Sequence, residues 1–153
     1  MNTHVIKVGG ENASDPRTAE WIAQKYQDGE KIAVAISALR TRWKLKTTDE
    51  LIRAQGAYNT SGMSEALKIL NNLFNVHIQT LKDAQMYDPH LEDKLRSLFS
   101  EYFPSDLVFP SDLLKQNPSS AQEQRFVGYG EVMSAHILSH ILDTRFCVAN
   151  NLI

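Results

Sequence analysis

Lys7-Val8-Gly9-Gly10 places an ammonium group and two glycines at the end of a short apolar run. Such a turn can bind an anion, because glycine allows close approach of the backbone and lysine supplies positive charge. The spacing fits neither a Walker A loop nor a GxGxxG turn, so the motif does not indicate a known nucleotide-binding fold. A plain turn between a strand and a helix is the alternative interpretation.

Two further polar side chains are candidates for the same site. Ser37 follows the second apolar run, and ligands of open α/β sheets gather at the carboxyl ends of the strands. Ser37 would therefore share one rim with Lys7 and the glycines if the two strands are adjacent and parallel. Glu131 lies in a helical pattern after Gly130, where its carboxylate could bind an ammonium group. A turn-capping serine and a solvent-exposed glutamate are the alternatives.

Two other features could carry chemistry, and both favour simpler interpretations. His136 and His140 are four residues apart, a spacing that can present two metal ligands on one helical face. No HExxH pattern or third ligand accompanies them, so we predict no metal site. Residues 40–46 are basic around Trp43 and could contact nucleic acid. The net charge of −2 favours a solvated loop, and we predict no nucleic-acid partner.

The elements that would position these residues begin with a strand–helix–strand unit. Residues 5–8 and 31–36 are short runs rich in β-branched residues and predict two strands. Asp15 and Pro16 predict a helix start between them, and such units have parallel strands. The nearly continuous apolar run at 31–36 favours a strand covered on both faces. The apolar face of the helix would consist of Ala19, Trp21, Ile22 and Tyr26.

Helices dominate the remainder of the pattern. Apolar spacing and capping residues predict helices from Thr47, from residue 63 to about 87, from Pro89, and after Ser119-Ser120. The glycine at 130 leaves open a later start of the last helix. Residues 105–118 indicate a short helix and a loop, and residues 145–149 a third strand. The predicted fold class is α/β, with a short, mainly parallel sheet and a large helical share.

Composition excludes several classes of protein. Hydrophobic residues make up 42% and charged residues 22% of the 153 residues, as in globular domains. The single cysteine, Cys147, excludes an intrachain disulfide, and we expect it to be inert core. No run of 18 apolar residues occurs, and residues 1–4 lack the pattern of a secretory signal. We therefore expect a cytoplasmic protein without a membrane partner.

Four segments, in this order and context, resemble the aspartate kinases of the amino acid kinase family. They are Lys7-Val8-Gly9-Gly10, Ser37-Ala38-Leu39, Lys46-Thr47-Thr48-Asp49 and Gly130-Glu131-Val132-Met133-Ser134. Members of the family open with a strand ending K-F-G-G, continue with a strand ending S-A, and carry a G-E-x-x-S helix start much later. The resemblance extends from Lys7 to about Val148 and implies a partial three-layer fold of the amino-acid-kinase type.

The resemblance implies a role for each matched residue. Lys7 would contact the transferred phosphoryl group, and Gly9-Gly10 would line the phosphate path. Ser37 and Thr48 would hold the amino acid, and Glu131 would bind its ammonium group. In the family, Mg-ATP phosphorylates the β-carboxylate of aspartate, the first step towards lysine, threonine and methionine. This chemistry depends on positioning and charge neutralisation.

The sequence departs from the family pattern in three ways. Glu11-Asn12 replaces the usual Thr-Ser and puts a negative charge beside the phosphate path. Residues 40–45 resemble an insertion. The nucleotide-binding half, with its G-R-G-G-S-D segment and catalytic aspartate, has no counterpart in residues 1–153. We expect these residues to be the N-terminal, amino-acid-binding portion of an aspartate-kinase-like domain, without activity alone.

Two hypotheses about function remain open from the sequence. One is a truncated aspartate kinase, and the other is a non-catalytic module of the same fold that binds an amino acid or dimerises. An unpaired last strand and uncovered apolar faces would invite association. We therefore predict a homodimer, formed by the helices between residues 63 and 143 or by the strand at 145–149.

Overall fold

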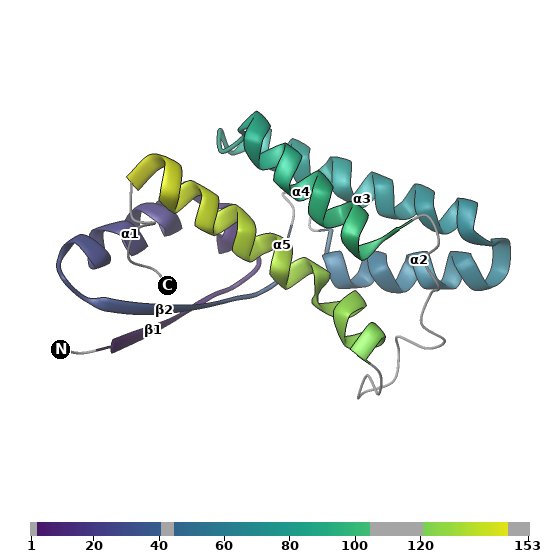
Figure 1. Cartoon of the computed structure of the whole chain (residues 1–153), viewed down its shortest axis with the longest axis horizontal. Coiled ribbons are helices and arrows are strands. Elements are labelled where there is room, and N and C mark those ends of the chain that lie inside the picture. Colours follow the sequence, from purple (N-terminus) through teal and green to yellow (C-terminus); the bar gives the residue numbers. More distant parts are fainter. Residues whose placement is uncertain (1–2, 41–44, 105–120, 147–153) are drawn as a thin grey trace.

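A computed structural model of the chain describes residues 3–40, 45–104 and 121–146 (Figure 1). The fold is mixed α/β and mainly helical, as the sequence indicates. The elements in chain order are β1 (Thr3–Val8), the 3-10 helix η1 (Asn12–Ser14), α1 (Pro16–Gln27), β2 (Lys31–Ile36), α2 (Thr47–Ser61), α3 (Met63–Asp83), α4 (Pro89–Tyr102) and α5 (Ala121–Phe146).

The two strands pair in parallel and are connected through α1, which confirms the predicted strand–helix–strand unit. In this pairing Val5 lies beside Ala33, and Val8 lies beside Ile36. The start of α1 is set by Asp15, whose carboxylate accepts a hydrogen bond from the Arg17 backbone N–H at 3.0 Å. An N-cap of this kind satisfies a backbone donor that the helix itself leaves unpaired.

The described elements cover only one face of the sheet. Val8 is buried, whereas Val5 on the opposite face is 75% exposed. Ala33 and Ala35, which alternate with the inward-facing residues of β2, are exposed as well. The prediction that both faces of residues 31–36 are covered is therefore wrong for the described part of the chain. A continuous apolar run cannot distinguish two covered faces from one covered face and one face of small alanines.

One aromatic residue of α1 also differs from the prediction. Ala19, Ile22 and Ala23 are buried, but Trp21 is 50% exposed. The buried residues form a stripe at helical spacing, and Trp21 lies at its margin. Its hydrophobicity suggested an inward position that the helical period does not support.

The helices α2 and α3 pack side by side and are joined at Gly62 (Figure 1). Gly62 has a φ of +87°, a backbone conformation that glycine adopts without strain. The predicted helix from 63 to about 87 ends earlier, at Asp83, because the chain turns at Gln85 with a φ of +56°. Asp88 then caps α4 by accepting hydrogen bonds from the backbone of His90 and Leu91.

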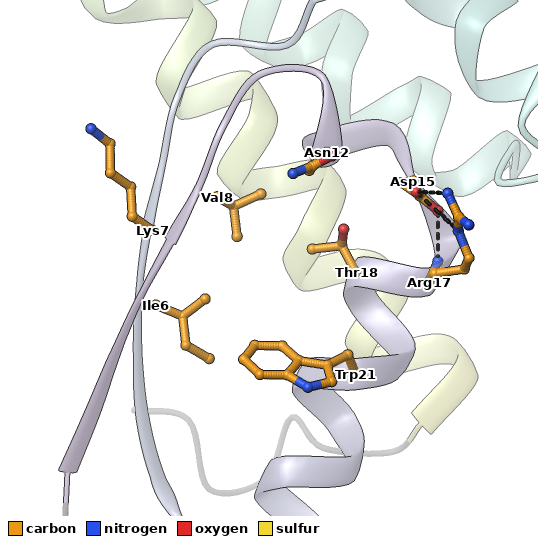
Figure 2. Close-up of a pocket in the computed structure, with 8 residues that line it drawn as sticks. All are labelled: Ile6, Lys7, Val8, Asn12, Asp15, Arg17, Thr18 and Trp21. Atoms are coloured by element: carbon orange, nitrogen blue, oxygen red, sulfur yellow. Dashed lines mark hydrogen bonds and ion pairs between the residues drawn. The ribbon is translucent and has the colours of Figure 1, made fainter.

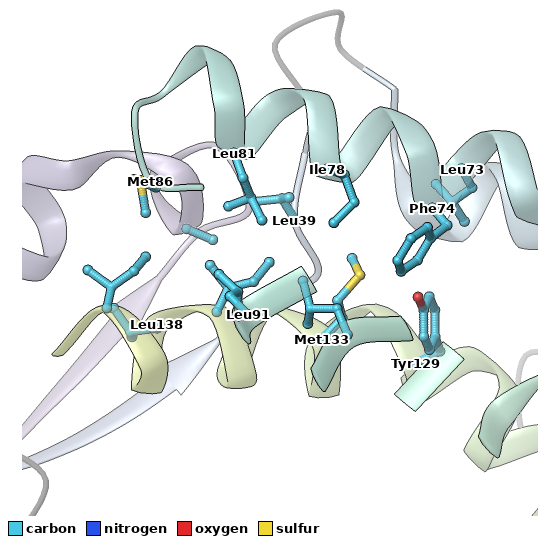
Figure 3. Close-up of a cluster of buried hydrophobic side chains, with 14 of the residues drawn as sticks. Leu39, Leu73, Phe74, Ile78, Leu81, Met86, Leu91, Tyr129, Met133 and Leu138 are labelled. Carbon is cyan, nitrogen blue, oxygen red and sulfur yellow. The ribbon is translucent and has the colours of Figure 1, made fainter. Parts of the chain in front are cut away.

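The helix α5 links the helical part of the fold to the sheet. It packs against α4 and α2 and also against α1 and β2 (Figure 1). Figure 3 shows its buried side chains facing those of α3 across one core. The residues labelled in that core are Leu39, Leu73, Phe74, Ile78, Leu81, Met86, Leu91, Tyr129, Met133 and Leu138.

The third predicted strand is not present in the described residues. Arg145 and Phe146 belong to α5, and residues 147–149 lie outside the described part of the chain. An aromatic and β-branched run is weak evidence for a strand where the preceding helix can continue. The helix α5 begins at Ala121, so the alternative start near residue 130 is also wrong.

Other sequence predictions cannot be compared with the structure. The short helix and loop at 105–118 and the environment of Cys147 lie outside the described residues. Within the described ranges, no helix combines the length and apolar character needed to cross a bilayer.

Candidate functional site

A cavity of about 280 Å³ lies where β1 and β2 end, beside the start of α2 and the middle of α5. We call it the strand-end pocket. Its lining consists of Gly10, Glu11, Ser37, Ala38, Leu39, Arg40, Lys46, Thr47, Thr48 and Glu131. Four predicted site residues from separate segments, Gly10, Ser37, Thr48 and Glu131, therefore come together in one cavity.

Backbone hydrogen bonds hold the two strand ends in place beyond the sheet itself. The Ser37 N–H donates to the Val8 carbonyl at 3.0 Å, and the Arg40 N–H donates to the Gly10 carbonyl at 3.0 Å. Arg40 also forms an antiparallel bridge with Lys46. Arg40 and Lys46 are thus held together in the pocket wall.

Two glycines are required by close packing around Ala38. A Cβ on Gly10 would lie 2.3 Å from the Ala38 carbonyl oxygen. A Cβ on Gly130 would lie 2.6 Å from the Ala38 Cβ and 2.9 Å from Thr47 Cγ2. By contrast, a Cβ on Gly9 would meet nothing within 4 Å. Gly10 and Gly130 therefore allow three chain segments to approach closely and bring Glu131 of α5 to the strand ends.

A buried polar contact holds Thr47, the first residue of α2, in the pocket wall. The Thr47 hydroxyl donates to the Leu39 carbonyl at 3.0 Å and lies 3.0 Å from Nε2 of His77. Because the threonine proton is used by Leu39, we infer that the imidazole N–H donates to Thr47 Oγ1. Burial lowers the pKa of His77 to about 3, so the ring is neutral at physiological pH.

The sequence predicts Thr47 as a helix start and as part of a resemblance segment, but not as a site residue, and it does not single out His77. The neighbouring Thr48 was chosen from the resemblance, and it lines the pocket as well. His77 lies on the buried face of α3, among its apolar residues. No sequence pattern around a single histidine in a helix predicts such a position. Only the packing of α3 against residues 39 and 47 reveals its role.

The pocket wall contains charges of both signs. Glu11 and Glu131 supply carboxylates, and Arg40 and Lys46 supply cations. The Arg40 guanidinium lies 2.8 Å from the Glu11 carboxylate, through Nη1 and Oε1. This ion pair offsets the negative charge that Glu11 places beside the glycine turn.

The first turn of α2 adds a preference for anions. Lys46, Thr47 and Thr48 line the pocket at the start of this helix, and Lys46 makes no side-chain cap hydrogen bond there. Free backbone N–H groups and the helix dipole favour a negative group at such a position. Asp49 and Glu50 in the first turn partly offset that preference.

Lys7 and Gly9 do not line the strand-end pocket. Lys7 is exposed and lies next to a different cavity of about 430 Å³ between β1 and α1. Figure 2 shows Ile6 and Val8 pointing toward the Trp21 side of β1, while Lys7 points away from it. Alternation along a strand requires this, since neighbouring side chains occupy opposite faces. Of the residues predicted to share one edge of the sheet, Gly10, Ser37 and Glu131 line the same cavity, and Lys7 and Gly9 do not.

The two histidines of α5 are in different environments. His140 is buried with Nε2 3.6 Å from Asp88 Oδ1, whereas His136 is exposed. Among the described residues, no three His, Cys, Asp or Glu side chains are grouped to hold a metal ion.

Comparison with models of known protein families gives no match, and comparison with curated protein sequences gives none either. The resemblance to aspartate kinases remains a prediction from the four segments and their arrangement.

Proposed function

We propose that the strand-end pocket binds a small acidic amino acid such as aspartate, as the amino-acid side of an aspartate-kinase-like site. One observation supports this most strongly. Ser37, Thr48 and Glu131, which the resemblance assigns to the amino acid, line one cavity although they come from three separate segments of the chain. The volume of about 280 Å³ is slightly below the usual range for drug-sized ligand pockets, which suits a small ligand.

The chemistry of the lining fits the groups of an amino acid. The exposed carboxylate of Glu131 can pair with an ammonium group. The hydroxyls of Ser37 and Thr48 can donate hydrogen bonds to a carboxylate. Lys46 and the start of α2 favour a negative group in the same pocket.

Binding rather than phosphoryl transfer is the proposed activity of these residues by themselves. The resemblance implies that Mg-ATP phosphorylates the bound aspartate in complete family members. Lys7, the residue implied to contact the phosphoryl group, points away from the α1 side of β1 and does not line the pocket. Phosphoryl transfer depends on positioned charges, so a lysine in this place cannot assist it without further protein groups.

Calorimetric titration of L-aspartate into the purified chain tests the proposal. We expect saturable binding, and a loss of about tenfold or more in affinity for Glu131→Gln, because a charged hydrogen bond to the ammonium group is removed. Glu20→Gln is the matched control, since Glu20 is exposed on α1 outside the pocket. The proposal fails if the wild-type chain does not bind aspartate, or if both variants bind it equally.

The exposed face of the sheet supports a second candidate function, a dimerising module. Val5 is 75% exposed, and each strand has one edge without a partner strand among the described residues. Two strands make a marginal sheet, and open edges invite pairing with another chain. We propose a homodimer in which a second copy covers this face.

A further inference from the structure

Arg40 is fixed at the mouth of the strand-end pocket by its backbone. The Arg40 N–H donates to the Gly10 carbonyl at 3.0 Å. Arg40 also forms an antiparallel β-bridge with Lys46, the residue before α2. Its side chain is 34% exposed, so most of the side chain is covered by protein. The position of the Arg40 backbone at the pocket therefore does not depend on the ion pair with Glu11.

Its present partner is held much less firmly. Glu11 lies in the turn after β1, and its side chain is 72% exposed. Ion pairs with an exposed member contribute little and are screened by salt, so another carboxylate can replace Glu11 at low cost. The ion pair that the structure shows is thus an exchangeable contact.

The pair also leaves part of the guanidinium unused. Glu11 contacts Nη1, whereas Nε is buried without a hydrogen-bond partner among the described residues. A guanidinium presents a planar set of five donors that matches a carboxylate with two hydrogen bonds. A ligand carboxylate that replaces Glu11 can form two hydrogen bonds with the guanidinium, whereas the structure shows one with Glu11.

The charges of the pocket lining also favour an acidic amino acid as the ligand. The pocket lining carries two carboxylates, Glu11 and Glu131, and two cations, Arg40 and Lys46. If Glu11 leaves, one carboxylate and two cations remain. Aspartate carries one ammonium group and two carboxylates, which is the complementary set.

We propose that Arg40 is the carboxylate-binding residue of the strand-end pocket, and that Glu11 is a built-in competitor that occupies Arg40 when no ligand is bound. The inference rests on the proposed function for the identity of the ligand. It identifies Arg40 as the residue that distinguishes an acidic amino acid from its neutral counterparts. It also gives a function to Glu11, which departs from the family pattern. Binding exchanges one ion pair for another, and no covalent bond changes.

Titrations with L-aspartate and L-asparagine test this inference, because asparagine has nearly the same shape without the second carboxylate. Glu11→Gln should tighten aspartate binding by about two- to fivefold, the range expected when a weak competing ion pair is removed. Arg40→Met should weaken aspartate binding by about tenfold or more and leave asparagine binding within about twofold. In the Arg40→Met background, Glu11→Gln should have no further effect, since the two residues act as a pair.

Controls separate the inference from the proposed function. Glu20→Gln changes the net charge equally and should not tighten binding, and thermal unfolding shows whether Arg40→Met is folded. If the wild type binds aspartate and Glu11→Gln does not tighten it, the inference is overturned and the proposed function stands. If neither protein binds aspartate, both are overturned. If only Glu11→Gln binds aspartate, the wild-type chain lacks the proposed function and Glu11 is not exchangeable, so both are overturned.

Discussion

Gly130 in the middle of α5 lies directly against Thr47, the first residue of α2. A methyl group on Gly130 would be 2.9 Å from Thr47 Cγ2, closer than side chains approach in proteins. This contact places the next residue, Glu131, at the ends of the strands. Thr47 is held in turn by the Leu39 carbonyl and by His77. The position of the candidate ligand-binding glutamate therefore depends on a glycine and a buried threonine.

Gly130→Ala should destabilise the protein by about 1–3 kcal/mol, because the added methyl group overpacks the contact with Ala38 and Thr47. Gly128→Ala is the matched control on the same helix, since a Cβ there meets nothing within 4 Å. That change should stabilise the protein by about 1 kcal/mol through helix propensity. Urea unfolding of both variants measures the difference. Equal effects of the two substitutions would contradict the close packing at Gly130.

Stability should fall as the pH drops below about 6.5, because His77 has a pKa of about 3 in the fold and about 6.5 in the unfolded chain. Between these values the unfolded chain binds a proton that the folded chain excludes. Lowering the pH from 6.5 to 5 should cost about 2 kcal/mol of unfolding free energy from this group.

His77→Gln should remove most of this pH dependence, since its amide N–H can still donate to Thr47 while the side chain no longer titrates. His136→Gln is the control, because His136 is exposed on α5 and should retain the full dependence. Urea titrations at both pH values provide the measurement. A pH dependence that is unchanged in His77→Gln would show that other groups cause it.

The purified chain should not release ADP above background when it is given aspartate and Mg-ATP in a coupled assay. The reason is that the Lys7 side chain points away from the α1 side of β1 and does not line the pocket that holds Ser37 and Glu131. A phosphoryl group cannot be neutralised and positioned from there. Turnover that disappears in Lys7→Ala would refute this prediction, whereas turnover that persists in that variant would indicate a contaminating enzyme.

The chain should form a homodimer at micromolar concentration, observed by sedimentation equilibrium. Its exposed sheet face carries Val5, and the described part of β1 has an open edge. Val5→Lys should shift the population to monomer and leave the circular dichroism spectrum unchanged, because the charge lies on the face away from the core. A wild-type chain of monomeric mass would contradict the proposed dimer.

The sequence by itself determined the local elements whose signals are local. Asp15 with Pro16 and Asp88 with Pro89 predict the starts of α1 and α4, and both helices begin there. The parallel pairing of residues 3–8 and 31–36 also follows from a strand–helix–strand pattern. Each of these signals depends on residues a few positions apart, so no distant contact was needed to interpret them.

Features that depend on distant contacts do not follow from the local sequence. Trp21 is hydrophobic and was expected on the buried face of α1, but its exposure is set by which face of that helix packs against the other elements. The predicted strand at 145–149 depended on intrinsic preference, which the continuing helix α5 overrides through Arg145 and Phe146. Preference for a strand or a helix is a small energy compared with packing.

For the candidate site, the sequence determined residue types and order, and the tertiary structure decided which of them meet. Ser37, Thr48 and Glu131 share a pocket because the missing side chains of Gly10 and Gly130 let three segments close around Ala38. Lys7 is separated from them because strand alternation turns it to the other face. The partnership of Glu11 with Arg40 and of Thr47 with His77 joins residues about thirty positions apart, and only the folded chain brings such pairs into contact.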